Sequence, residues 1–212
     1  MVDNGAVSET TRTEAFSDGV LAIAATLLVL DLRVPEPSGQ SLAGQLAHDG
    51  WPSYAAYVTS FLVIGIIWVN HHGVFALVGK VDRVTLFLNL LLLMFVVAIP
   101  FTTALLARYL RAGGGDARTA ALVYSGVMLA MSVAFAALYT YVAMHPALLA
   151  EGVDPAAVRT SIVRFSAVGT LLYVATLIVA LFSAPLCLVA HFLIALYYCF
   201  EQIRTGRRPA RA

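Results

Sequence analysis

The sequence predicts an all-α integral membrane protein with six transmembrane helices. Its 212 residues are 60% hydrophobic and 12% charged, with a mean hydropathy of +0.86. A soluble domain averages about 45–50% apolar and about 25% charged residues, and no soluble core of this size hides so much apolar surface. The apolar residues also gather in long runs that polar, Gly- and Pro-containing loops separate. The whole chain, 1–212, is therefore predicted to be a single six-helix transmembrane domain.

Loop-forming and interfacial residues bound the predicted helices. The stretch from Pro35 to Gly39 ends the first helix, and Pro185 marks a tight turn before the last. Trp51 and Tyr54 suit a membrane–water interface, so the second helix begins beside them. The expected spans are 16–32, 52–70, 84–107, 119–143, 159–183 and 186–200.

The basic residues predict the orientation, since loops rich in Lys and Arg face the cytoplasm. Six spans place both termini on one side of the membrane. If that side is the cytoplasm, nine of the 13 basic residues are internal: Arg12, Lys80, Arg83, Arg159, Arg164, Arg204, Arg207, Arg208 and Arg211. The external ones are Arg33, Arg108, Arg111 and Arg118. We therefore expect a multi-pass protein of the bacterial inner membrane with cytoplasmic termini, although the external third loop is unusually basic.

Enzymatic, metal-binding and nucleic-acid-binding functions find little support. The net charge of +1 implies no nucleic-acid surface. Adjacent His71 and His72 point about 100° apart on a helix, which does not suit a shared metal ion. No Ser or Cys lies in a recognisable nucleophile motif. We expect no enzyme activity, no metal and no cofactor, and the lipid bilayer as surroundings.

The first predicted helix carries more polarity than a helix that only faces lipid. Ser17 and Asp18 lie at its beginning, Thr26 near its middle and Asp31 at its end. Along it, large apolar side chains recur at helical spacing next to a line of small ones: Phe16, Ile23, Leu27 and Leu30, beside Gly19, Ala22 and Thr26. The line is either a packing seam or, where symmetry copies converge, a hydrophobic constriction of a pore.

Ser17 and Asp18 also allow two interpretations. They either cap the start of the helix or form a polar contact with the end of the second helix. In the expected topology Trp68 and His71 share their depth, and a ring N–H would satisfy an aspartate partly removed from water. Asn89, inside the third span, is expected to bond to a neighbouring helix.

Three motifs in order resemble one family. Arg12-x-x-x-Phe16-Ser17-Asp18, continuing into the stretch from Ala22 to Asp31, is similar to the first helix of the transmembrane protein 175 family. The stretch from Ile67 to His72 resembles the end of the second helix of that family. The stretch from Asn89 to Met94, followed by Pro100-Phe101-Thr102, resembles its third. The family comprises endolysosomal potassium channels of animals and their bacterial relatives. The second half of the chain matches only in hydropathy and helix count.

The resemblance implies a potassium-permeable cation channel with modest K⁺ over Na⁺ selectivity and K⁺ as the permeant ion. Animal members carry two six-helix repeats and pair as dimers, so a single repeat implies a homotetramer. The first helices would line its pore, with Ile23, Leu27 and Leu30 as successive aliphatic rings and Ile23 the narrowest. Thr26 would offer partial hydration, and Asp31 would concentrate cations at the outer mouth. The residues expected to support the pore helix are Arg12, Phe16, Ser17, Asp18, Trp68, Asn70 and His71.

Two other classes stay open at this point. A proton-coupled secondary transporter would use Asp18 and the histidines at the membrane end as coupling groups. No discontinuous helix pair or inverted repeat in the sequence favours it. A membrane scaffold would transport nothing.

Overall fold

The computed structural model describes residues 4–37, 39 and 41–200, and within these ranges the protein is helical, without a strand. The helices, in chain order, are α1 (Asn4–Leu27), α2 (Leu42–Gly44), α3 (Trp51–Phe75), α4 (Arg83–Tyr109), α5 (Gly114–Met144), α6 (Pro155–Ala180) and α7 (Ala184–Phe200). Three shorter turns accompany them: η1 (Leu28–Asp31), η2 (Gln45–Asp49) and η3 (Pro146–Leu148). The basic residues Arg204, Arg207, Arg208 and Arg211, which contribute to the expected orientation, lie outside the described residues.

Five helical segments of the described chain are long and apolar enough to cross a membrane. They are Glu9–Asp31, Trp51–Phe75, Arg83–Tyr109, Gly114–Met144 and Pro155–Ala180. The sixth apolar helix, α7, has 17 residues and is shorter. The molecule is therefore a multi-pass helical membrane protein, and the crossing by α7 stays a prediction.

The first helix begins twelve residues earlier than its expected span, at Asn4 rather than residue 16. Hydropathy detects only the apolar part of a helix, whereas the polar turns before Phe16 continue the same hydrogen-bonded helix. Ser17 and Asp18 thus lie inside α1, and the interpretation that they cap its start is wrong. The loop after η1 also contains α2 and η2, which hydropathy does not reveal.

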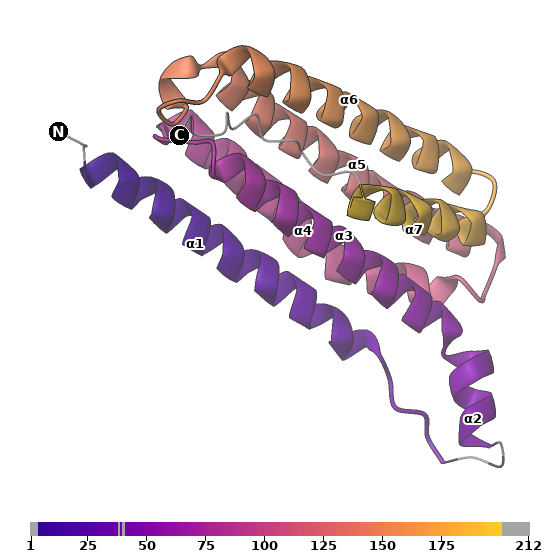
Figure 1. Cartoon of the computed structure of the whole chain (residues 1–212). Helices are drawn as coiled ribbons and strands as arrows, with labels where there is room; N and C mark the ends of the chain where they lie inside the picture. The colour runs from indigo at the N-terminus through magenta and orange to yellow at the C-terminus, as the bar shows by residue number, and fades with distance from the viewer. Residues whose placement is uncertain (1–3, 38, 40, 201–212) are drawn as a thin grey trace.

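Figure 1 shows the long helices running alongside one another, with α1 at one edge of the bundle. The helices α3 and α4 pack against α1, while α6 and α7 lie on the opposite side. Successive long helices run in opposite directions, so the start of α1 lies at the same end as the end of α3. The helix α2 projects beyond the other end of the bundle.

The centre of the bundle combines apolar packing with hydrogen bonds between helices. Its largest fully buried side chains include Ile64, Leu92, Tyr124 and Met128. Ser60 on α3 lies 2.7 Å from the Thr103 hydroxyl on α4 and 3.0 Å from the Tyr124 hydroxyl on α5. Because a buried hydroxyl without a partner is costly in an apolar medium, these bonds fix how the three helices meet.

The connection from α3 to α4 is fastened at its end by Asp82. Its carboxylate caps α4 by accepting the Thr85 backbone N–H at 2.8 Å and the Thr85 hydroxyl at 2.6 Å. The Tyr141 hydroxyl on α5 donates to the second oxygen at 2.6 Å. Hydrogen bonds to the charged form lower a carboxyl pKa, and these lower the pKa of Asp82 to about 2.

Candidate functional site: the two faces of the first helix

The helix α1 has one face buried against the bundle and one face free of it. Thr13, Ser17, Leu21, Ala24 and Leu28 are buried and follow one another at intervals of three or four residues. This spacing is typical of the packed stripe of a helix. The buried stripe holds α1 against α3 and α4.

The other face carries the apolar line that the sequence singles out. Ile23 and Leu30 are 60% and 73% exposed, against 2% for Leu21 on the packed face. Phe16 and Leu27 belong to the same line and are also exposed. Within one chain these side chains are therefore not part of a packing seam. In a membrane protein such a face meets lipid, another protein surface or the interior of a pore.

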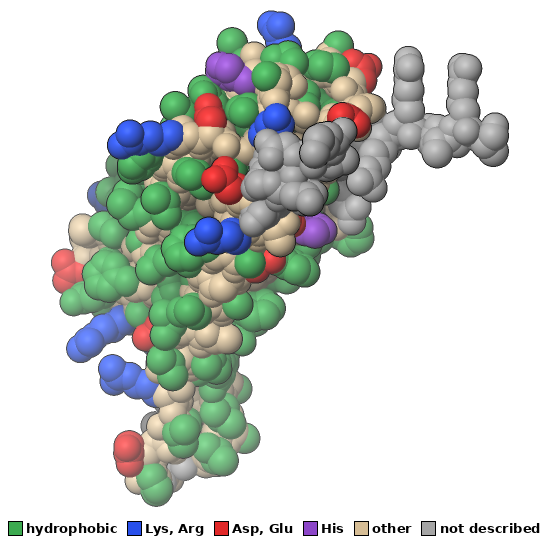
Figure 2. All heavy atoms as spheres, turned by 90° about the vertical axis from the view of Figure 1, so that its left-hand side faces the viewer, with side chains coloured by type: hydrophobic (Ala, Val, Ile, Leu, Met, Phe, Trp, Pro, Cys, Tyr) green, Lys and Arg blue, Asp and Glu red, His purple; other side chains and the backbone are tan. Residues whose placement is uncertain are grey.

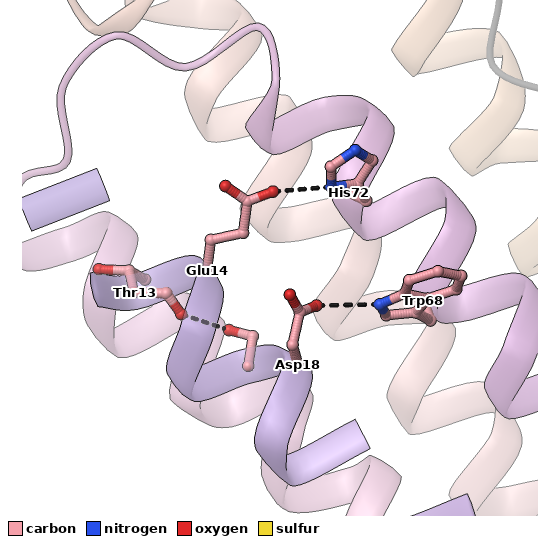
Figure 3. A network of polar contacts seen from close by, with 6 residues as sticks. Thr13, Glu14, Asp18, Trp68 and His72 are labelled. Carbon is pink, nitrogen blue, oxygen red and sulfur yellow. Dashed lines mark hydrogen bonds and ion pairs between the residues drawn. The ribbon is translucent and has the colours of Figure 1, made fainter. Parts of the chain in front are cut away.

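Two polar contacts connect the middle of α1 to the last turns of α3 (Figure 3). The Trp68 indole N–H donates to the Asp18 carboxylate at 3.0 Å, and the His72 ring nitrogen lies 2.8 Å from the Glu14 carboxylate. Glu14 and Asp18 are four residues apart, as are Trp68 and His72, so the contacts form successive rungs between antiparallel helices. The Trp68 and His72 rings also stack, with centroids 6.5 Å apart.

A buried chain of hydrogen bonds lies beside these rungs and joins three helices. The Asn89 amide on α4 donates to the Ser17 hydroxyl on α1 at 2.9 Å. The amide oxygen of Asn89 lies 2.9 Å from Nε2 of His71 on α3. Since an amide oxygen only accepts, His71 donates from Nε2. Ser17 in turn donates to the Thr13 carbonyl at 2.9 Å, whereas the buried Nδ1 of His71 has no partner among the described residues.

The other residues predicted to support α1 lie outside these contacts. Arg12 and Phe16 are exposed and line a cavity of about 420 Å³ between α1 and α4. The Asn70 amide donates at 2.9 Å to the Ile66 carbonyl of its own helix. The structure thus brings Asp18 to Trp68, and Ser17 to His71 through Asn89, but does not bring Asn70 to α1.

Thr26 lies on α1 and Asp31 lies in the short helix η1 that follows it. Thr26 lies on the exposed face, and its hydroxyl donates to the Ile23 carbonyl at 2.9 Å, which leaves its oxygen lone pairs facing outward. Asp31 ends η1 and lines a cavity of about 650 Å³ at the opposite end of the bundle from the rungs.

Sequence reasoning missed the contact between Glu14 and His72. The signal was the shared spacing of four residues in Glu14/Asp18 and Trp68/His72, which allows two parallel rungs once the helices are known to be antiparallel. Among the described residues no group of three or more His, Cys, Asp or Glu side chains could hold a metal ion.

The fold and this helix define a class, a multi-pass helical membrane protein with an exposed apolar face on its first helix. The family profile "Endosomal/lysosomal potassium channel TMEM175" matches residues 12–100. A potassium channel of Streptomyces collinus is 52% identical over 206 residues, which cover 97% of this chain and 99% of that protein. The chain belongs to the TMEM175 family, and the family resemblance seen in its motifs is confirmed.

The structure agrees with this membership. A crystal structure of a lysosomal potassium-selective channel TMEM175 homolog from Chamaesiphon minutus has a TM-score of 0.76 and 39% sequence identity. The match covers 91% of this chain and 97% of that one. The endosomal/lysosomal proton channel TMEM175 of Gallus gallus is 42% identical over 106 residues, which cover 46% of this chain and 21% of that protein. The matches to the bacterial proteins therefore include the second half of the chain, where the sequence motifs gave no signal.

Proposed function

We propose that this protein is a potassium-permeable cation channel, formed by four copies whose α1 helices line a central pore. The observation that carries the proposal is the division of α1 into two faces. One face is fastened to α3 and α4, while the side chains of the line Phe16, Ile23, Leu27 and Leu30 are exposed. Symmetry copies of that line, meeting on an axis, would enclose a narrow apolar passage.

In such a passage the aliphatic side chains would act as filter and gate. Rings of Ile23, Leu27 and Leu30 would exclude water when narrow, which blocks ions by dewetting. An ion that passes must shed part of its hydration shell, and K⁺ gives up water more readily than Na⁺. Selectivity of this origin is modest because no oxygen atoms replace the lost water.

Two polar residues suit the ends of this path. Thr26 lies within a turn of Ile23 and Leu27 and would present its hydroxyl oxygen to an ion next to the constriction. Asp31 stands beyond Leu30 and would raise the local concentration of cations at the outer mouth. The rungs at Asp18 and Glu14 lie nearer the middle of α1, beside the end of α3, and would hold α1 at a fixed distance from the axis.

The names of the relatives support the same function. Bacterial proteins that match this chain over nearly their whole length, from Streptomyces collinus and Chamaesiphon minutus, are named potassium channels. We further propose six membrane crossings, with α7 as the sixth, in a bacterial inner membrane and with both termini in the cytoplasm.

The test is ion flux into proteoliposomes that contain the purified protein, under a potassium gradient and without a proton gradient. A channel conducts K⁺ down its gradient alone and conducts Na⁺ less well. Saturable flux that requires an imposed proton gradient would instead indicate a transporter that uses Asp18 and the histidines. Absence of flux under both conditions would contradict both functions.

A further inference from the structure

Three of the four arginines that the expected orientation places outside the cell line a single cavity. The residues Arg33, Arg108 and Arg111 lie on the side assigned to the exterior, where the positive-inside rule expects few basic residues. In the structure all three line the cavity of about 650 Å³ at the end of the bundle. They come from separate segments, because Arg33 follows η1 whereas Arg108 and Arg111 lie at and beyond the last turn of α4. The fold therefore brings together three arginines that are far apart in the sequence.

The charge of this cavity is positive. Its lining residues include three guanidinium groups and one carboxylate, that of Asp31. Within the described chain, no hydrogen bond or ion pair engages the side chain of Arg108, which is exposed. Figure 2, in which the α1 side faces the viewer, shows basic and acidic side chains at the lower end of the bundle beside hydrophobic ones. A cation pore gains nothing from guanidinium groups near its mouth, so the proposed conduction does not explain them.

The depth of the cavity matches that of lipid head groups. Tyr54 at the start of α3 and Tyr109 at the end of α4 belong to its lining, and Trp51 lies one turn before Tyr54. Tyr and Trp rings gather at the boundary between hydrocarbon and water. Arginine side chains at this depth reach the phosphate layer of a bilayer.

The lining along α4 changes from charged to apolar in the direction of the membrane centre. Phe101, Leu105 and Arg108 lie on one face of the helix, at intervals of four and three residues. Phe101 is largely exposed. A soluble anion would use only the arginine end of this stripe, whereas a phospholipid would use its whole length.

We propose that this cavity binds an anionic phospholipid, with the phosphate at Arg33 and Arg108 and an acyl chain along Phe101 and Leu105. In the proposed orientation the lipid belongs to the outer leaflet. Guanidinium groups pair with phosphate oxygens by charge-assisted, bidentate hydrogen bonds. The bound lipid would tie the segment after η1 to the end of α4.

Native mass spectrometry of the purified protein tests this inference, with phosphatidylglycerol and phosphatidylcholine of identical acyl chains as probes. The protein should retain phosphatidylglycerol preferentially. Arg108→Gln and Arg33→Gln should each lower its affinity about fivefold, the effect of one basic residue at an anionic membrane surface. Arg118→Gln is the matched control, since it removes an arginine from the same side of the membrane but outside the cavity lining.

Equal retention of both lipids, or equal losses in the Arg108 and Arg118 variants, would overturn the proposal. Displacement of the lipid by inorganic phosphate at comparable concentration would also overturn it, because the cavity would then be a site for soluble anions. Arg33 lies outside any helix, so its variant keeps the test open if Arg108→Gln fails to fold. The readout is independent of ion flux, so its outcome and that of the channel proposal are separate.

Discussion

At Asn89 a single side chain joins three helices. It donates to Ser17 on α1 and accepts from His71 on α3, and all three residues are buried. The sequence predicted that Asn89 would bond to a neighbouring helix but not which partners it would find. Ser17 and Asn89 are separated by 72 positions, and only the packing of α1 against α4 brings them together.

Asn89→Ala should therefore destabilise the protein more than most polar substitutions. It leaves the buried Nε2 of His71 without its acceptor, which costs about 1–3 kcal/mol, and it removes the bond to Ser17, which keeps its own bond to the Thr13 carbonyl. Asn70→Ala is the matched control, since that amide bonds only within its own helix and its loss should cost less. Thermal unfolding in detergent measures the difference. Equal melting temperatures for the two variants would show that the Asn89 contacts add nothing.

Among the helices, α1 makes several polar contacts with its neighbours α3 and α4. The apolar run in its sequence does not predict them. The sequence predicted the existence of the long helices, because apolar runs of membrane length leave few alternatives. It did not predict where α1 begins. The polar turns from Asn4 onward have no hydropathy signal, so the apolar run alone places the start of the helix too late.

The start of α4 allows a prediction about pH. Because hydrogen bonds hold the pKa of Asp82 down at about 2, its contribution to stability is present above the unfolded pKa of about 3.9 and is lost as the pH falls through the folded value. Asp82→Asn should cost about 1 kcal/mol near neutral pH, because a neutral amide can still cap the helix but loses the charge that strengthens the bonds from Thr85 and Tyr141. The gap between wild type and variant should narrow as the pH falls below about 4 and close as the pH falls through the folded pKa of about 2.

Melting temperatures of both proteins at about pH 6 and about pH 2 measure the difference in stability between them. Glu36→Gln is a control, since Glu36 is an exposed carboxylate in the loop after η1. A gap that is constant over this range would mean that the ionised carboxylate of Asp82 is not what stabilises the start of α4.

For the whole molecule, the proposed channel explains the exposed apolar line of α1 by an assembly of several chains. One chain carries one such line, so a pore needs several copies, and we expect four. Native mass spectrometry should find a particle of four times the chain mass of 22.6 kDa. A monomer or a dimer that still conducts ions would contradict the proposed architecture. The sequence alone predicts this line from the spacing of its apolar residues. Only the structure shows that the opposite face of α1 is the buried one, so that the line is not a packing seam within one chain.

The most direct test of the central claim is the K⁺ to Na⁺ permeability ratio of Ile23→Asn in planar bilayers. If α1 lines the pore, a polar side chain at Ile23 widens the hydrated path, so conductance should rise and the ratio should fall. Ile178→Asn is the matched control, with the same substitution at a comparably exposed position, 53% against 60%, on α6. It should leave the ratio unchanged. An unaltered ratio in Ile23→Asn, with conduction intact, would contradict the account and remove this residue from the path of the ion.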